Sequence, residues 1–166
     1  MAKNLEIKVK IPSFTPFLAI LNKKGIKQKE VLHQKDIYYK TGNVRLKLRI
    51  ENENERAIYY SRAEAGGTDR FSDYELLEIS SGNGESFFNK LFTPEIIVEK
   101  ERILYIIGDT RIHLDNVKKL GTFLELETVV TRDENSAKEE FNKIVNWLDL
   151  NSYEEYRNSY SDLMAK

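Results

Sequence analysis

The stretch NLEIKVKI, residues 4–11, alternates between apolar and charged side chains. Successive side chains of a β-strand point to opposite faces, so this stretch predicts a strand with one apolar and one charged face. The apolar face carries Leu5, Ile7, Val9 and Ile11. The charged face carries Glu6, Lys8 and Lys10. The fold depends on which face turns inward, because an inward row of acids and bases needs a charged guest or partner to offset its burial.

The composition limits the classes of protein to consider. The length of 166 residues fits one domain, which we expect to span residues 1–166. The 26 Lys and Arg against 27 Asp and Glu lack the positive excess of nucleic-acid and membrane-surface proteins. The absence of cysteine excludes disulfides and thiolate metal sites. Because neither a signal peptide nor an apolar run of roughly 20 residues is present, we expect a cytoplasmic protein without nucleic-acid or membrane partners.

Hydrophobic periodicity predicts an α+β fold. Strands are expected at about residues 3–11, 26–40, 44–51, 56–64, 71–80, 95–107, 111–117 and 122–131. The connections between them are short and rich in turn residues, which favours antiparallel neighbours. Helices are expected between Ser13 and Gly25, over GESFFNKLF (residues 84–92), from Asn135 or Ser136 through Leu148, and from a cap at Ser152 to Leu163.

Charged side chains share one face on most of the other strands. They are Arg45, Lys47 and Arg49; Arg62; Asp73 and Glu75; Lys100 and Arg102; Arg111, His113 and Asp115; and Glu125 and Glu127. Two arrangements fit. The charges can coat a sandwich with an apolar core, which the pattern alone favours because buried charge is costly. Alternatively, the strands close into an inside-out barrel whose water-filled tunnel holds a polyanion and metal ions, with helices covering the outside. The segregation of acids and bases by strand fits the tunnel.

Six fragments carry a resemblance to a known family. They are NLEIKVKI, GNVRLKLR, IYYSR, SDYEL, VEKER and TRIHLDNVKKLGTFLELE, in this order between about residues 4 and 130. The chain resembles the CYTH superfamily of triphosphate tunnel metalloenzymes, and most closely its class IV adenylyl cyclase-like branch. The resemblance implies an eight-stranded antiparallel barrel, closed or nearly closed, with helices on the outside. It also implies that basic residues bind a triphosphate and that carboxylates bind Mg²⁺ or Mn²⁺. The resemblance therefore reverses the preference for a sandwich whose charges face solvent.

The resemblance assigns the metal ligands to the first and eighth strands. The family's first strand reads Glu-x-Glu-x-Lys, which places Asn4 at the first Glu, Glu6 at the second and Lys8 at the Lys. Glu125 and Glu127 match its closing acidic pair. The expected metal ligands are therefore Glu6, Glu125 and Glu127. The amide at Asn4 weakens a site built on hard oxygen donors, so the number of metals stays open.

The resemblance also assigns the phosphate-binding residues. They are Lys8, Lys10, Lys47, Arg49, Arg62, Lys100, Arg102 and Arg111. Arg grips two phosphate oxygens with its planar fork, while Lys supplies a movable point charge. Direct catalytic roles are assigned to Lys8, Lys100 and Arg102. Three residues are assigned supporting roles: Glu75, Asp115 as an acid that orients a base, and His113, for which a structural role is the simpler explanation.

The implied function is conversion of ATP to cyclic AMP and pyrophosphate. One alternative is a hydrolase of thiamine triphosphate or tripolyphosphate, which would use the same apparatus on the terminal phosphorus. A second alternative is a binder without catalysis, toward which Asn4 points. A nucleoside triphosphate or related triphosphate is the expected partner, and a homodimer is an open alternative to a monomer.

Overall fold

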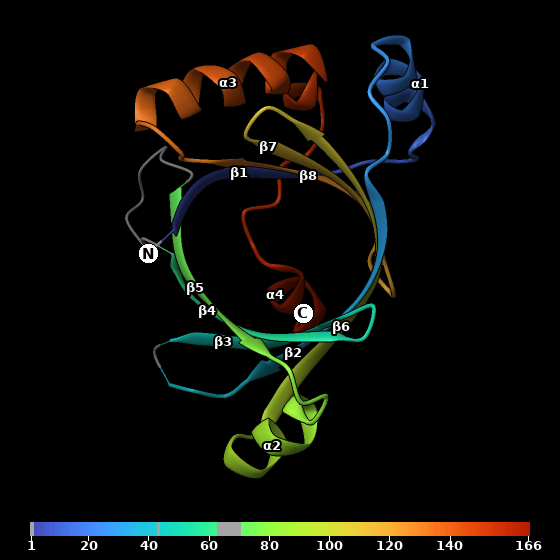
Figure 1. The fold of residues 1–166 in the computed structure, drawn as a ribbon. Coiled ribbons are helices and arrows are strands. Elements are labelled where there is room, and N and C mark those ends of the chain that lie inside the picture. The colour runs from blue at the N-terminus through green and yellow to red at the C-terminus, as the bar shows by residue number, and fades with distance from the viewer. Residues whose placement is uncertain (1, 43, 63–70) are drawn as a thin grey trace.

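The computed structural model describes residues 2–42, 44–62 and 71–166. For residues 2, 60–62 and 71–73 it describes the backbone only. Eight antiparallel strands form a closed barrel in the order β1-β5-β4-β3-β2-β6-β7-β8 (Figure 1). The strands are β1 (Ala2–Lys10), β2 (Glu30–Tyr39), β3 (Arg45–Glu51), β4 (Asn54–Arg62), β5 (Phe71–Ile79), β6 (Pro94–Ile107), β7 (Thr110–Val117) and β8 (Gly121–Val129). β1 closes the ring because it pairs with both β5 and β8. The predicted fold class is confirmed.

The helices lie outside the barrel, with one exception. They are α1 (Thr15–Lys23), α2 (Gly84–Leu91), α3 (Glu134–Trp147), a short 3-10 helix (Leu150–Ser152) and α4 (Tyr160–Met164). α1 and α3 pack on the side that contains β1, β7 and β8, and α2 lies on the opposite side beside β2 and β3 (Figure 1). No described helix combines the length and apolar character needed to cross a membrane.

Several predicted boundaries need correction. Phe14 and not Ser13 occupies the N-cap of α1, and Asp133 caps α3 by accepting from Ser136 N. Gly25 does end the α1 region, with a φ of 74° that glycine adopts freely. The following residues are not yet strand, because Ile26 N donates to Leu21 O in the turn after the helix. β2 therefore begins four residues later than expected, at Glu30.

The barrel is inside out. Its main hydrophobic core lies between the outer face of the sheet and helices α1 and α3. From the sheet this core contains Leu5, Ile7, Val9, Ile112, Leu114, Leu124 and Leu126, and from α3 it contains Phe141, Ile144 and Val145. The apolar face of NLEIKVKI therefore points outward, and the charged face points into the barrel. A sandwich with a solvated coat is excluded.

α4 fills one end of the barrel. The chain before it runs alongside β1, where Glu155 forms a bridge with Val9 and Tyr156 N donates to Lys8 O. Tyr160 then packs inside against Val98, Val117 and Phe123, and the helix is seen within the ring in Figure 1. Ser159 caps α4 through a reciprocal capping box with Asp162, so the expectation of a cap at Ser152 is wrong. The barrel interior is thus closed at this end.

The inside-out arrangement predicts unequal costs for two identical substitutions on the outer face. Leu126 is 0% exposed beneath the helices, whereas Leu77 is 64% exposed on β5. We expect Leu126→Ala to lower the free energy of unfolding by about 2–5 kcal/mol, because it leaves a cavity. The control Leu77→Ala should change it by about 0.5 kcal/mol or less. Urea unfolding measures both, and equal costs would contradict the position of the core.

Candidate functional site

The inner face of the barrel encloses a cavity of about 370 Å³ lined by all eight strands and by Ser159 and Tyr160. Six predicted bases line it: Lys8, Lys47, Arg49, Lys100, Arg102 and Arg111. Three predicted acids, Glu6, Glu125 and Glu127, line it as well. Alternation along the strands turns these side chains inward, and their convergence makes the interior the candidate site.

Asp36 on β2 gathers three of the bases. Its carboxylate is fully buried and accepts from Arg49 Nε and Nη2, both at 2.8 Å, in a two-pronged ion pair. Lys100 Nζ lies 3.0 Å and Lys47 Nζ 3.5 Å from Asp36 Oδ2. Burial alone would raise the pKa of Asp36, but Arg49, Lys100 and Lys47 together hold it well below the usual value. Asp36 is therefore an anion that neutralises and positions a cation cluster.

The two lysines beside Asp36 hold their protons weakly. Burial, with Arg49 nearby, lowers the pKa of Lys47 to about 7. Burial also lowers the pKa of Lys100, to about 8, although Asp36 opposes the shift. One carboxylate does not offset three neighbouring cations, so an anionic guest that enters the cavity would raise both pKa values again.

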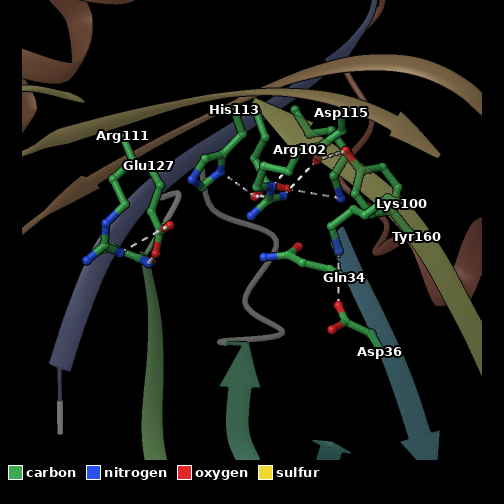
Figure 2. Close-up of polar contacts among 12 residues, drawn as sticks. Gln34, Asp36, Lys100, Arg102, Arg111, His113, Asp115, Glu127 and Tyr160 are labelled. Atoms are coloured by element: carbon green, nitrogen blue, oxygen red, sulfur yellow. Dashed lines mark hydrogen bonds and ion pairs between the residues drawn. The ribbon is translucent and has the colours of Figure 1, made fainter. Parts of the chain in front are cut away.

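Arg102 is the centre of a second ion-pair cluster. Its Nε and Nη2 atoms donate to the two oxygens of Asp115 at 2.7 Å each, and Nη2 also lies 3.2 Å from Glu125 Oε1 (Figure 2). The Tyr160 hydroxyl donates to Asp115 Oδ2 at 2.7 Å. Burial would lower the pKa of Arg102, but Asp115 and Glu125 hold it well above the usual value. The guanidinium is thus permanently charged and fixed in orientation.

Lys8 and His113 both lie beside Glu125. Lys8 Nζ is 3.7 Å from Glu125 Oε2, donates to the carbonyl of Asn158 at 3.1 Å and lies 4.2 Å from the Tyr160 ring centre. His113 Nδ1 is 3.4 Å from Glu125 Oε1. Burial and Arg102 lower the pKa of His113, so the imidazole is neutral at pH 7. This placement fits a structural role for His113.

The three expected metal ligands come from paired strands. Glu6 lies directly opposite Glu127, and Lys8 opposite Glu125. Glu127 accepts from Asn4 Nδ2, and its Oε2 is 3.6 Å from Arg111 (Figure 2). Among the described side chains, no three His, Asp or Glu groups converge as a ready metal site. Glu125 is held by Arg102, whereas Glu6 and Glu127 lie side by side on paired strands and both line the cavity, a placement that suits a shared metal ion.

Three expected site residues do not line the cavity, and the side chain of a fourth is not among those that the structure describes. The expectation that Glu75 faces inward is wrong, because Tyr74 and Leu76 line the cavity and Glu75 is exposed. Lys10 is exposed beyond the lining, with Nζ 5.5 Å from the ring centre of Phe123. Asp115 lies behind the lining as the partner of Arg102. The side chain of Arg62 lies outside the described part of the chain.

Several lining residues were not predicted from the sequence, among them Gln34, Asp36, Arg56 and Tyr160. Gln34 and Asp36 alternate with His33, Lys35 and Ile37, so this strand has no clean apolar face and its two-residue period did not show which face points inward. Tyr160 follows Ser159 in the Ser-x-x-Asp pattern of a helix start, which was a usable signal for α4. Nothing in the sequence indicated that α4 enters the barrel.

Comparisons with known proteins agree with this architecture. The model of the CYTH domain family matches residues 2–160. The PH1819 protein of Pyrococcus horikoshii superposes with a TM-score of 0.75 at 20% identity, with 98% of both chains covered. A candidate adenylate cyclase from Vibrio parahaemolyticus superposes with a TM-score of 0.74 at 19% sequence identity, again with 98% of both chains covered.

A more distant solved structure adds a second activity to the comparison. The candidate adenylyl cyclase HpAC1 from Hippeastrum, described as having a dominant triphosphatase activity, gives a TM-score of 0.66 at 14% identity and covers 90% of this chain and 88% of that one. These identities show a shared fold. No curated protein gives a significant match.

The Asp36 cluster predicts a stability loss that depends on pH. Asp36→Asn leaves buried cations without their anion, so we expect the free energy of unfolding to fall by about 3–5 kcal/mol. Asp36 raises the pKa of Lys47 and Lys100 in the folded state, so folded wild type binds more protons than the folded variant up to about pH 8. The loss should therefore be larger at pH 6 than at pH 9.

Urea unfolding at these two pH values measures the effect. The control is Glu75→Gln, a change of the same kind at an exposed position on the outer face. A loss for Asp36→Asn no larger than for the control, or one that grows with pH, would show that Asp36 does not anchor the cluster.

Proposed function

The chain belongs to the CYTH domain family, and we propose that it is a divalent-metal-dependent enzyme acting on a triphosphate bound inside the barrel. One observation carries the proposal. Five bases, Lys8, Lys47, Arg49, Lys100 and Arg102, line a single cavity that α4 closes at one end. Such a row of cations suits a guest with several adjacent negative charges.

The two kinds of base would act differently on a phosphate chain. Arg49 and Arg102 are already fixed by Asp36 and Asp115, so they form the rigid part of the site. Lys47 and Lys100, with lowered pKa values, would gain protons as the anion enters. Arg111, at the other side of the cavity, and Arg62 belong to the same proposed set, whereas the exposed position of Lys10 removes it from direct contact.

Glu6 and Glu127 fit a divalent cation. Both are hard oxygen donors, they face each other across paired strands, and both line the cavity. Mg²⁺ commonly takes one or two carboxylates and completes its shell with water and substrate phosphates, so a third protein carboxylate is not required. A bound Mg²⁺ or Mn²⁺ would neutralise phosphate charge and lower the pKa of an attacking oxygen.

The chain's own residues would stabilise the charge that develops on the departing phosphates. Lys8, Lys100 and Arg102 lie nearest the closed end and are the proposed catalytic residues, acting as cations. Asp115 and Tyr160 would hold the Arg102 guanidinium in one orientation. The guanidinium would then need no reorganisation as charge develops in the reaction. Neutral His113 would support Glu125.

We propose the cyclase-like reaction first, in which the ribose 3′-hydroxyl attacks the α-phosphorus and pyrophosphate leaves. Hydrolysis of the terminal phosphate is the second candidate, favoured by the triphosphatase activity described for the Hippeastrum protein. Incubation with ATP, tripolyphosphate or thiamine triphosphate and Mg²⁺ or Mn²⁺, followed by chromatography, separates the two by their products. Tight binding of all three without turnover would support a binder instead. A cytoplasmic location and a homodimer stay predictions.

The row of bases predicts selection by phosphate number. We expect ATP to bind about 100-fold or more tightly than AMP, because each added phosphate gains charge-assisted bonds of about 1.5–3 kcal/mol. Binding at pH 8.5 should take up protons, since the free lysines are partly neutral there and the terminal phosphate, with a pKa of about 6, is ionised. The affinity should accordingly decrease between pH 7 and pH 9.

Calorimetry in two buffers with different ionisation heats measures both quantities. Lys100→Met should weaken ATP binding and reduce the proton uptake, and Lys27→Met, at an exposed position, should leave both unchanged. Equal affinities for AMP and ATP would mean that the cavity does not recognise the phosphate chain.

The proposed metal ligands predict opposite effects of two substitutions. Glu127→Gln keeps the shape and removes a charge, so turnover should fall by at least about 10–100-fold while tripolyphosphate affinity without metal is kept or rises. Asn4→Glu adds a carboxylate and should tighten Mn²⁺ binding. Metal titrations and initial rates measure these effects, with Glu75→Gln as the outward-facing control. Unchanged turnover in Glu127→Gln would rule out this carboxylate as a ligand.

A further inference from the structure

The second half of β5 has an open edge. On one side, β4 pairs with β5 as far as its last residue, Ile79. On the other side, β1 pairs with β5 only as far as Tyr74, which lies opposite Ala2, the first residue of β1. No strand among the described residues pairs with Glu75–Ile79 on that side, where β5 runs on past the start of β1 toward α2 (Figure 1). Such an edge is a template for another strand, and this segment is here called the free edge.

The free edge exposes apolar side chains on both faces of the strand. Leu76, which faces the interior, is 52% exposed, and Leu77, which faces outward, is 64% exposed. Glu75 and Glu78 on either side of them supply the charges that commonly discourage edge pairing. They nevertheless leave two adjacent leucines in contact with water, which is unfavourable for an isolated chain. The free edge therefore combines an open backbone with apolar surface that a partner would bury.

α2 extends this apolar surface on the outer side of the sheet. Glu85 and Asn89 of α2 bond to side chains of β2, so they mark the side of the helix that faces β2. Phe87 and Leu91 lie on the other side of the helix, because each residue turns it by about 100°. The strand order places β4 and β5 on that side. Phe87 is 59% and Leu91 60% exposed, so the outer face beside the free edge is apolar as well.

The free edge is complementary to itself in one antiparallel register. A two-fold axis at Leu77, its middle residue, sets the two copies of Leu77 opposite each other. Glu75 then lies opposite Ile79, and Leu76 lies opposite Glu78, so no acid directly faces an acid. An axis at Glu78 would oppose two carboxylates. An axis at Leu76 would leave only three residues to pair, because the residue before the free edge is already paired with β1. Charge and length therefore favour the same register.

We propose that the free edge binds a second copy of this chain, so that the two β5 strands pair about Leu77 and join the two barrels through one continuous sheet. On the outer face the two Leu77 side chains would bury each other, flanked by Phe87 and Leu91 of both copies. On the inner face each copy would place its Glu78 opposite Leu76 of the other, and Leu76 lines the cavity. The second copy thereby adds a carboxylate to the wall of the site. The inference does not depend on which reaction takes place there.

The mass of the intact chain in solution tests the proposal. Sedimentation between about 1 and 100 μM should show the average mass rising from 19.4 kDa toward twice that value, because a short strand pair gives an interface of small to standard size. Leu77→Lys should weaken the dimer by about tenfold or more, since like charges then face each other at the axis. The matched control is Ile97→Lys, at an outward-facing position on β6 that is 44% exposed, which should leave the dimer unchanged.

Position 77 allows two sharper tests because it is predicted to face itself. Leu77→Lys and Leu77→Glu should each be monomeric, and an equimolar mixture of the two should dimerise, since opposite charges then meet at the axis. The chain has no cysteine, so Leu77→Cys carries a single thiol. Directly opposed residues of antiparallel strands have Cα atoms about 4.5–5.5 Å apart, within the reach of a disulfide. Mild oxidation should therefore cross-link Leu77→Cys, and the control Ile97→Cys should stay uncrosslinked.

The outcomes separate this interface from others. A wild-type chain that keeps a mass of 19.4 kDa over the whole concentration range overturns the inference and leaves the free edge to a different protein. A dimer that survives Leu77→Lys overturns it too, because the copies then meet through another surface. So does a mixture of the Lys and Glu variants that stays monomeric, or cross-linking of Ile97→Cys as fast as of Leu77→Cys, because the register about Leu77 is then wrong.

Discussion

The contact between Asp36 and Arg49 is the interaction on which the interior depends. A barrel lined with bases on neighbouring strands would repel itself if no anion were built into its wall. Asp36 supplies that anion from β2, directly opposite Arg49 on β3 and close to Lys100 on β6. Through these ion pairs it links three adjacent strands, β3, β2 and β6. Asp115 does the same for Arg102 across β6 and β7.

Closure of the sheet makes this charged interior compatible with a stable fold. Because β1 pairs with both β5 and β8, the described strands form a ring, and the closure does not require an apolar core on the inside. The hydrophobic stabilisation is moved to the outer face, where α1 and α3 cover it. The interior is then free to hold water, ions and a guest. Stability and binding are thus assigned to opposite faces of the same strands.

Much of this arrangement could be predicted from residues near the start of the chain. The two-residue period of NLEIKVKI placed Glu6 and Lys8 on one face, and the same rule placed Lys47, Lys100 and Glu125. The prediction for Glu75 was wrong because Tyr74 and Leu76, on the other face of β5, line the cavity, and an error of one residue in register exchanges the two faces of a strand. Asp36 was overlooked because a single acid gives no charged stripe. The direction of the charged faces, inward or outward, came from family resemblance, since the period alone is the same in both cases.

Because α4 fills one end of the barrel, a guest can enter and leave the cavity through the other end. A guest whose phosphates lie against Lys8 and Lys100 has its far end toward the other opening, because Tyr160 and Phe123 occupy the space beyond those bases. If the guest is the proposed triphosphate, the fragment bound deepest would leave last, after the outer fragment. The phosphate fragment would then be the second product to depart. The fold itself would thereby impose an order on release, without any moving part.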